Sequence, residues 1–309
     1  MADIVISEFM DEAAIAEILK GYDVLYDRKL VDDGPRLEEA LSNARGLVVR
    51  NRTQVRGTLL QHAPNLKVIG RLGVGLDNID LEACAERQIQ VFPATGANDV
   101  AVAEYVIATA MMLVRGAYLS TGSVVNGDWP RGALMGGEVA GRSLGLVGYG
   151  SIARKTADRA RALGMTILAY DPFLGAVDPA WAGTENVSLD DLLSRADIIS
   201  LHTPLTDETR HMIDGTALSR VKPTTVLINA ARGGVVDEGA LAEALRNGAL
   251  AGAALDVFED EPLAGEGGAR FEGIPNLILT PHIAGVTDES NIRVSRLTLE
   301  NVVSVLNNS

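Results

Sequence analysis

The stretch Leu144-Gly145-Leu146-Val147-Gly148-Tyr149-Gly150-Ser151-Ile152-Ala153 decides how the middle of the chain folds. Its first four residues predict a strand, and the glycines after them predict a tight turn into a helix that extends through Leu163. Gly148 permits the turn, Gly150 lets a ligand approach the backbone, and Ala153 stands where a third glycine is usual. Because a helix N-terminus attracts anions, the stretch predicts a pyrophosphate site.

The residues after this helix bear on the kind of dinucleotide. Thr166–Tyr170 predicts the next strand, and Asp171 follows it directly. An acidic side chain there accepts hydrogen bonds from the adenosine ribose hydroxyls and repels a 2′-phosphate. We therefore expect NAD rather than NADP as the cofactor, and no metal. The alternative is that Asp171 and Pro172 only begin a turn.

Strands and helices alternate on both sides of this stretch, which predicts an α/β protein with two doubly wound parallel-sheet domains. The expected strands span residues 4–6, 23–26, 46–50, 67–70 and 90–93 in the first series, and 143–147, 166–170, 198–202, 225–229, 252–257 and 277–280 in the second. Between the series, 97–126 predicts one long helix, with Asn98 or Asp99 as its N-cap. Its run Val100–Ala117 is almost wholly apolar, which predicts burial on every side, either between two domains or between two subunits. A last amphipathic helix over 286–306 has an apolar face of Ile292, Leu299, Val302, Val303 and Leu306.

Composition narrows the classes of function. The chain has 309 residues, which suits two domains, and its net charge is 27 − 41 = −14. This charge argues against binding to nucleic acid or to an anionic membrane, and it requires a locally basic site for an anionic substrate. Cys84 is the single cysteine, so no internal disulfide can form. With no signal peptide and no apolar run of about 18 residues, we expect a cytoplasmic protein.

Three residues of the second half could carry acid–base chemistry on a hydroxy acid. Arg232 follows a strand end, where open α/β sheets bind ligands, and its planar fork suits a carboxylate. His282 also follows a strand and is a candidate general base, although His202 occupies a similar position. Glu261 could hold the histidine in its charged form, with Glu259 and Asp260 as rivals in the same acidic loop.

At these residues the sequence resembles the D-isomer-specific 2-hydroxyacid dehydrogenase family. The glycine turn and the segments 229–237, 256–262 and 281–285 follow one another in the family's order and spacing, and the resemblance covers essentially the whole chain. It implies that Arg232 binds the substrate carboxylate and carbonyl, that His282 transfers the proton, and that Glu261 pairs with His282. It moves His202 to the cofactor side. Among the implied NAD contacts, Thr203 and Pro204 lie at the adenine and Asp256 lies at the nicotinamide carboxamide. The other implied contacts are Gly148, Gly150, Ser151, Ile152, Asp171, Ala230 and Gly285.

The resemblance also implies a domain division and a substrate loop. Residues 1–97 with 286–309 would form a discontinuous, flavodoxin-like substrate domain, and residues 98–285 an NAD domain of Rossmann type. A homodimer through the NAD domain is expected. The loop Gly73-Val74-Gly75 would receive the substrate carboxylate on backbone N–H groups.

A basic cluster bears on the substrate's side chain. Arg50-Asn51-Arg52 ends a strand and Arg71 lies near it, so Asn51 and Arg52 are expected to contact a second anionic group such as a sulfonate, phosphonate or carboxylate. The alternative is a solvent-facing arginine pair. Within the family the chain is most similar to the 3-phosphoglycerate dehydrogenase branch and, more narrowly, to sulfolactate dehydrogenases, which implies (S)-3-sulfolactate as the substrate.

Two rival functions stay open. In a glyoxylate or hydroxypyruvate reductase, the substrate would have no second anionic group for the basic cluster to bind. An NAD-sensing binding protein would need no turnover, and the complete set of Arg232, Glu261 and His282 argues against it.

Overall fold

The computed structural model describes residues 2–118 and 120–308. The chain divides into two compact units, Met1–Asn98 with Val286–Ser309 and Asp99–Gly285. We call these the first unit and the second unit. Among the described residues, none of the helices combines the length and apolar character that crossing a membrane requires.

The first unit is built on a five-stranded parallel sheet with the order β2-β1-β3-β4-β5. This is the flavodoxin-like order, and it confirms the predicted fold class. Its strands are β1 (Ile4–Ile6), β2 (Val24–Tyr26), β3 (Gly46–Val49), β4 (Val68–Arg71) and β5 (Gln90–Pro93). Because the strands are parallel, the segments after β1, β3 and β4 emerge side by side at one edge.

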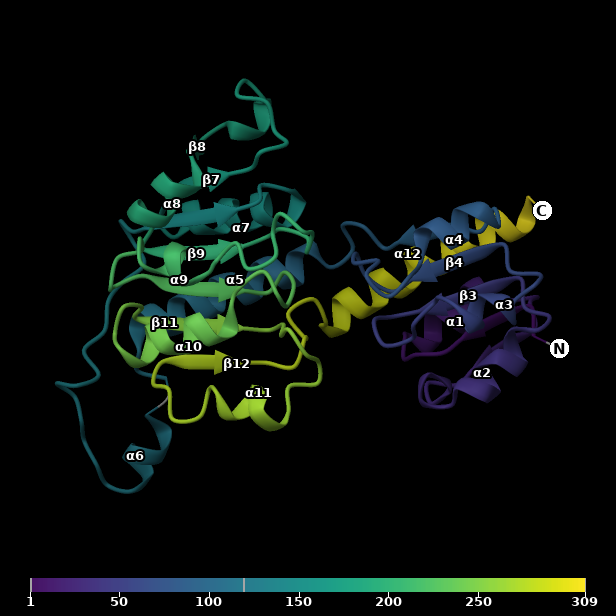
Figure 1. Cartoon of the computed structure of the whole chain (residues 1–309), viewed down its shortest axis with the longest axis horizontal. Helices are drawn as coiled ribbons and strands as arrows, with labels where there is room; N and C mark the ends of the chain where they lie inside the picture. Colours follow the sequence, from purple (N-terminus) through teal and green to yellow (C-terminus); the bar gives the residue numbers. More distant parts are fainter. Residues whose placement is uncertain (1, 119, 309) are drawn as a thin grey trace. The chain divides into compact units, whose positions relative to one another are not determined.

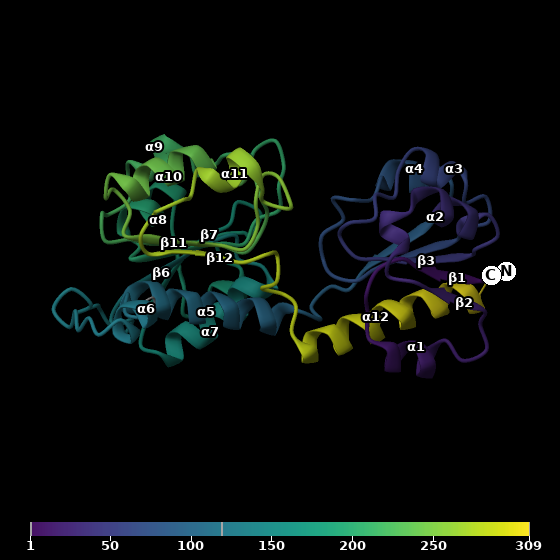
Figure 2. The ribbon, with the colours of Figure 1, turned by 90° about the horizontal axis from the view of Figure 1, so that it is seen from below.

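Helices cover both faces of this sheet, as Figure 2 shows. One face carries α1 (Glu12–Ile18) and the long α12 (Asp288–Asn307), and the other carries α2 (Gly34–Leu41), α3 (Thr58–Gln61) and α4 (Leu81–Glu86), with the 3-10 turn η1 (Leu30–Asp32) before α2. The predicted apolar face of α12 is wrong at Ile292, which is exposed. Val294 and Val305 are buried in its place, since they align with Leu299 and Val302 on one helical stripe.

The second unit is built on a seven-stranded parallel sheet with the order β12-β11-β10-β9-β6-β7-β8, which is the Rossmann order extended by one strand. Its strands are β6 (Ser143–Val147), β7 (Thr166–Tyr170), β8 (Glu185–Asn186), β9 (Ile198–Leu201), β10 (Val226–Asn229), β11 (Gly252–Leu255) and β12 (Leu277–Leu279). Six of these strands were expected from the sequence. The seventh, β8, has two residues, too few to give a periodic pattern.

Two helical layers enclose this sheet (Figure 2). One layer holds α5 (Asp99–Arg115) and α7 (Ser151–Ala162), and the other holds α8 (Leu189–Arg195), α9 (Gly215–Leu218) and α10 (Glu238–Arg246), while the turn η2 (Pro179–Trp181) and the short helices α6 (Thr121–Val125) and α11 (Gly265–Ala269) lie in connections. Aspartates start several helices through side-chain caps, among them Asp214 at α9 and Asp237 at α10.

The predicted single helix over 97–126 is wrong. The helix α5 ends at Arg115 because Gly116 adopts φ +66° and its N–H bonds back to the Met112 carbonyl at 2.9 Å. Within this range Leu119 lies outside the described residues. Within the single chain α5 is not buried on every side, since Met111 is exposed, and burial between two subunits stays a prediction.

Candidate active site and dinucleotide site

The glycine turn after β6 has the conformation that its sequence predicts. Gly148 adopts φ +87°, and a Cβ at this position would lie 2.7 Å from the His202 carbonyl oxygen. Only glycine avoids both the strained backbone and this clash. The turn therefore lies against the segment that follows β9.

The helix after this turn begins differently from its neighbours. Its N-cap is Gly150, which supplies no side-chain cap, whereas Asp214 and Asp237 cap α9 and α10. The first N–H groups of the 12-residue α7, beginning at Ser151 and Ile152, are thus left for a ligand. A pyrophosphate fits this N-terminus, where the helix dipole also favours negative charge.

Asp171 is fixed at the end of β7. One carboxylate oxygen accepts the Tyr149 N–H at 2.8 Å, and the other accepts the Phe173 N–H at 2.9 Å. Each oxygen retains further acceptor capacity for the hydroxyls of a ribose. The carboxylate that was expected to select NAD is therefore tied to the glycine turn by a hydrogen bond.

The segment after β9 supplies a further polar group. Among the described residues, the buried Thr203 hydroxyl has no hydrogen-bond partner, and its methyl group lies 3.2 Å from the place that a Cβ on Gly148 would take. A buried unsatisfied hydroxyl suits a bound ligand. Pro204 follows it and is exposed. Glycine turn, uncapped helix, carboxylate and hydroxyl together fit an NAD molecule.

His202 is not suited to acid–base chemistry near neutral pH. Burial lowers its pKa to about 4, and its Nε2 lies 3.0 Å from the Ser200 hydroxyl. The imidazole is therefore neutral over the physiological range. The expected place of His202 on the cofactor side stays a prediction.

His282 and Glu261 form the pair that the resemblance implied. Nδ1 of His282 lies 2.8 Å from a carboxylate oxygen of Glu261, whose other oxygen accepts the Phe258 N–H at 3.1 Å. Burial would raise the pKa of Glu261. The bond and charge of His282, the Phe258 N–H and the charge of Arg232 outweigh burial and hold this pKa below its usual value. Of its two rivals, Glu259 has a different partner, since it bonds His211 at 3.1 Å.

Arg232 is presented by a rigid loop after β10. The Asn229 side chain accepts the Ala231 N–H at 3.1 Å and donates to the Arg232 carbonyl at 2.9 Å. A Cβ on Gly233 would lie 1.7 Å from the Phe258 carbonyl oxygen, so this glycine lets the Arg232 loop approach the segment that carries Glu261. Ala230, a predicted cofactor contact, lies in the same loop.

A buried network that the sequence did not reveal orients the His282 loop. Asp256 is 1% exposed and accepts hydrogen bonds from the Thr280 hydroxyl at 2.6 Å and from the N–H groups of Ile283 and Ala284 at 2.8 Å each. Thr280 in turn lies 2.7 Å from the Tyr105 hydroxyl on α5. His282 itself adopts φ +53° and donates its N–H to the Asp256 carbonyl at 2.8 Å. The loop ends at Gly285, and the expected contact of Asp256 with nicotinamide stays a prediction.

In the first unit, Arg50 is the buried member of the predicted basic cluster. Its side chain donates to the Asn291 amide oxygen at 2.7 Å, and its guanidinium carbon lies 3.9 Å from the centroid of the Phe9 ring. Arg50 is 9% exposed, and burial lowers its pKa to about 10 against the opposing charges of Glu8 and Tyr26. Among the described residues, its guanidinium contacts an amide and a ring and forms no ion pair with a carboxylate. Burying a cation without a compensating anion costs free energy.

The neighbours of Arg50 differ from it. Asn51 is partly exposed, and the exposed Arg52 side chain forms an ion pair with Asp32. Glu8 accepts the backbone N–H groups of Arg50 at 2.9 Å and of Arg52 at 3.2 Å, which fixes this loop. The structure thus separates the two arginines that the sequence had grouped.

The Gly73-Val74-Gly75 loop follows β4 at the same edge of the first sheet. It is joined to β3 through the Leu72 N–H, which donates to the Val49 carbonyl at 2.8 Å, and to the end of β5 through the Gly73 carbonyl, which accepts the Ala94 N–H at 2.8 Å. Adjacent strands therefore bring this loop and the segment that begins with Arg50 together.

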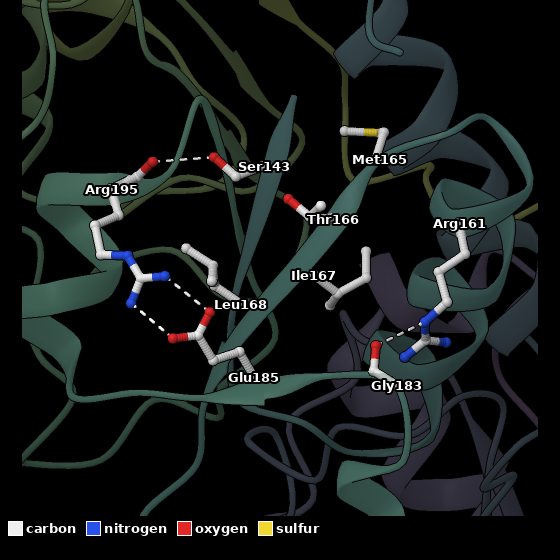
Figure 3. A pocket seen from close by; sticks show the side chains of 9 residues that line it. All are labelled: Ser143, Arg161, Met165, Thr166, Ile167, Leu168, Gly183, Glu185 and Arg195. Atoms are coloured by element: carbon white, nitrogen blue, oxygen red, sulfur yellow. Dashed lines mark hydrogen bonds and ion pairs between the residues drawn. The ribbon is translucent and has the colours of Figure 1, made fainter. Parts of the chain in front are cut away.

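A pocket of about 540 Å³ lies away from these residues, at the amino ends of β6 and β7 (Figure 3). Its charged side chains are engaged within the protein. Arg195 binds Glu185 through two hydrogen bonds of 2.9 and 2.8 Å, and Arg161 donates to the Gly183 carbonyl at 3.1 Å. We assign no chemistry to this pocket.

Comparison with known proteins places the geometry in a family. Residues 107–284 match the model of the D-isomer specific 2-hydroxyacid dehydrogenase NAD-binding domain. The (S)-sulfolactate dehydrogenase of Chromohalobacter salexigens is 55% identical over 303 residues, which cover 98% of this chain and 97% of the relative. The D-3-phosphoglycerate dehydrogenase of Archaeoglobus fulgidus is 40% identical over 84% of this chain, and the match spans 49% of that relative.

A solved structure extends the likeness to three dimensions. The D-lactate dehydrogenase of Aquifex aeolicus, in complex with NAD and lactic acid, matches with a TM-score of 0.87 and 32% identity. The match covers 99% of this chain and 95% of that one.

Proposed function

Because the chain belongs to the D-isomer specific 2-hydroxyacid dehydrogenase family and is an NAD-dependent oxidoreductase, we propose that its substrate carries a second anionic group, with (S)-3-sulfolactate and 3-sulfopyruvate as the pair it interconverts. The identity with a relative named (S)-sulfolactate dehydrogenase supports this choice. The stereochemistry agrees, since sulfur outranks the carboxylate in naming priority. (S)-3-sulfolactate therefore has the spatial arrangement of D-lactate.

The two units divide the work in this proposal. Residues 98–285 bind NAD through the glycine turn, Asp171 and Thr203. Residues 1–97 with 286–309 bind the substrate. The family model that matches 107–284 supports the first assignment, and the buried cation at Arg50 supports the second.

The second unit supplies the groups for proton transfer. NAD, when bound, supplies the acceptor for the hydride that leaves the hydroxyl-bearing carbon. The His282 Nδ1 faces Glu261, so Nε2 is the atom that takes the hydroxyl proton during oxidation and returns it during reduction. The ionised Glu261 stabilises the resulting imidazolium. Arg232 binds the substrate carboxylate and polarises the carbonyl oxygen.

The first unit supplies the substrate specificity, and the burial of Arg50 is the observation that carries this proposal. The Gly73–Gly75 backbone receives the carboxylate at the end of β4. At the end of the adjacent β3, the Arg50 guanidinium binds the sulfonate, whose negative charge compensates the buried cation. Asn51, the next residue, is a neutral amide that can donate a hydrogen bond to the same sulfonate, whereas the exposed Arg52 is already paired with Asp32.

The test is NADH formation with a panel of 2-hydroxy acids: both sulfolactate enantiomers, 3-phosphoglycerate, malate, D-lactate and glycerate. We expect kcat/KM to be highest for (S)-sulfolactate and far lower for its enantiomer. A preference for 3-phosphoglycerate would support the site for a second anion but would make that anion a phosphate instead of a sulfonate. A preference for glycerate or D-lactate would refute the site, and no turnover on any acid, with NAD still bound, would favour a sensor.

We also propose that the protein is a homodimer. The segment around α6 stands apart from the rest of its unit in Figure 1 and carries large exposed apolar side chains, with Trp129 73% and Met135 85% exposed. Apolar groups so exposed suit a subunit interface. Light scattering after size exclusion should give about twice the chain mass of 32.6 kDa, and a Trp129→Ser substitution should lower it.

We further propose that the protein works in the cytoplasm. Its one cysteine, Cys84, is a free and buried thiol, which suits a reducing compartment. Fractionation of the producing cells, with NADH formation as the readout, tests this location.

A further inference from the structure

The middle residue of the glycine turn has a side chain that no step so far uses. The Tyr149 ring is 2% exposed and stacks on Trp181, with ring centroids 5.1 Å apart and an angle of 5° between the planes. Trp181 belongs to η2, in the connection between β7 and β8. Its indole N–H donates to the Gly175 carbonyl at 2.9 Å, which fixes the ring within that connection.

Hydrogen bonds reinforce the stack at its far end. The Tyr149 hydroxyl lies 2.6 Å from the Thr184 hydroxyl, and Arg161 donates to both, at 3.3 and 2.5 Å. Arg161 also donates to the Gly183 carbonyl at 3.1 Å, the contact drawn in Figure 3. The tyrosine is thus held at its ring and at its hydroxyl.

The same residue also touches the beginning of this connection. The Tyr149 N–H donates to Asp171, the first residue after β7, at 2.8 Å. Tyr149 therefore binds the 171–184 connection at both of its ends, through its backbone at Asp171 and through its side chain at Trp181 and Thr184. Displacement of the ring would move the N–H that orients the Asp171 carboxylate.

We propose that the Tyr149–Trp181 stack is a positioning element that holds Asp171 against the glycine turn and so sets how strongly the protein prefers NAD to NADP. Asp171 bonds the ribose hydroxyls of NAD and repels the 2′-phosphate of NADP. Both effects require the carboxylate at a fixed place relative to the pyrophosphate turn. Loss of the stack therefore weakens the hydrogen bonds to the ribose of NAD and reduces the repulsion of the 2′-phosphate of NADP.

The experiment measures NADH and NADPH binding to the full chain by fluorescence titration, without substrate. Trp181→Leu should raise the Kd for NADH about threefold to tenfold, as loss of an aromatic pair predicts. The Kd for NADPH should stay unchanged or fall, so the preference for NADH narrows. Trp181→Phe keeps a stacking ring and should restore most of the preference. In turnover, Trp181→Leu should raise KM for NAD and leave kcat unchanged at saturation.

A matched control separates positioning from general loosening. Phe271→Leu removes a buried aromatic ring from the core on the other face of the sheet and should leave the NADH-to-NADPH ratio unchanged. If Trp181→Leu does not fold, Tyr149→Phe and Thr184→Val remove the hydroxyl contacts and should shift the ratio in the same direction by less. A ratio that stays at the wild-type value in the folded variants would overturn the proposal. Since no substrate is present, that failure would leave the proposed reaction untouched.

Discussion

The two sheets have similar glycine-containing turns at their carboxyl edges. The second unit turns at Gly148–Gly150 after β6, and the first unit turns at Gly73–Gly75 after β4. In each unit a helix also contributes one polar side chain that holds a functional group: Tyr105 of α5 through Thr280 in the second, and Asn291 of α12 at Arg50 in the first.

The difference lies in how charge is balanced. In the second unit His282 has a carboxylate partner at 2.8 Å, so the pair is complete before a substrate arrives. In the first unit the buried Arg50 is held by an amide and a ring. In the proposed function, the group that moves protons is thus paired within the protein, whereas the group that selects an anion leaves its compensating charge to the ligand.

The largest effect is expected at the paired group. His282→Ala removes the proton acceptor and should lower kcat by about 10² to 10⁴-fold, because general acid–base help is worth that much. NADH binding should stay at the wild-type level. His211→Ala, at a partly exposed histidine of the same unit that bonds Glu259, is the matched control for turnover. A near-normal kcat in His282→Ala would remove the catalytic assignment.

Substitution of Arg50, whose side chain forms no ion pair among the described residues, should affect one substrate and spare another. Arg50→Gln should lower kcat/KM for (S)-sulfolactate by about 10 to 100-fold, because a hydrogen bond to a charged group contributes about 1.5–3 kcal/mol. D-lactate, which lacks the sulfonate, should react with Arg50→Gln and wild type at similar rates. Arg36→Gln, at an exposed arginine paired with Asp27, is the control for lost positive charge. An equal loss on both acids would make Arg50 structural.

A pH series tests the contrast between the two histidines that follow strands. The folded-state pKa of His202 is about 4, below the ordinary value of 6.5, so the unfolded chain binds more protons between these values. The stability that neutral His202 contributes is complete above pH 6.5 and is lost as pH falls toward 4. Between pH 7 and pH 5 this amounts to about 2 kcal/mol of unfolding free energy.

Urea unfolding at the two pH values measures this loss. His202→Gln should remove about that much of the pH dependence, and the exposed His62→Gln should keep it. An unchanged slope in His202→Gln would show that His202 is solvated and able to titrate near neutral pH.

The sequence predicted the parts of the site that depend on strand order. Because parallel strands end at one edge, Gly148, Asp171, Arg232 and His282 could each be placed there from their position after a strand. The resemblance then selected Glu261 over Glu259 and Asp260, and the structure agrees through the bond to His282.

What the sequence could not predict depends on packing between distant segments. The break at Gly116 was hidden because apolar residues continue on both sides of a single glycine. The separation of Arg50 from Arg52 depends on Phe9 and Asn291, which lie 41 and 241 residues from Arg50. Only the folded chain brings them together.

The smallest expected effect tests whether α5 supports the proton-transfer group as α12 supports Arg50. The Thr280 hydroxyl has one hydrogen and donates it to Asp256, so the Tyr105 hydroxyl donates to Thr280 at 2.7 Å. Tyr105→Phe removes this bond and keeps the ring, which should lower the unfolding free energy by about 1 kcal/mol. Since Thr280 and Asp256 orient the His282 loop, kcat should fall a few-fold while the Kd for NADH is unchanged. A stability loss with an unchanged kcat would mean that Asp256 holds the loop without help from α5, and the parallel between the two helices would fail.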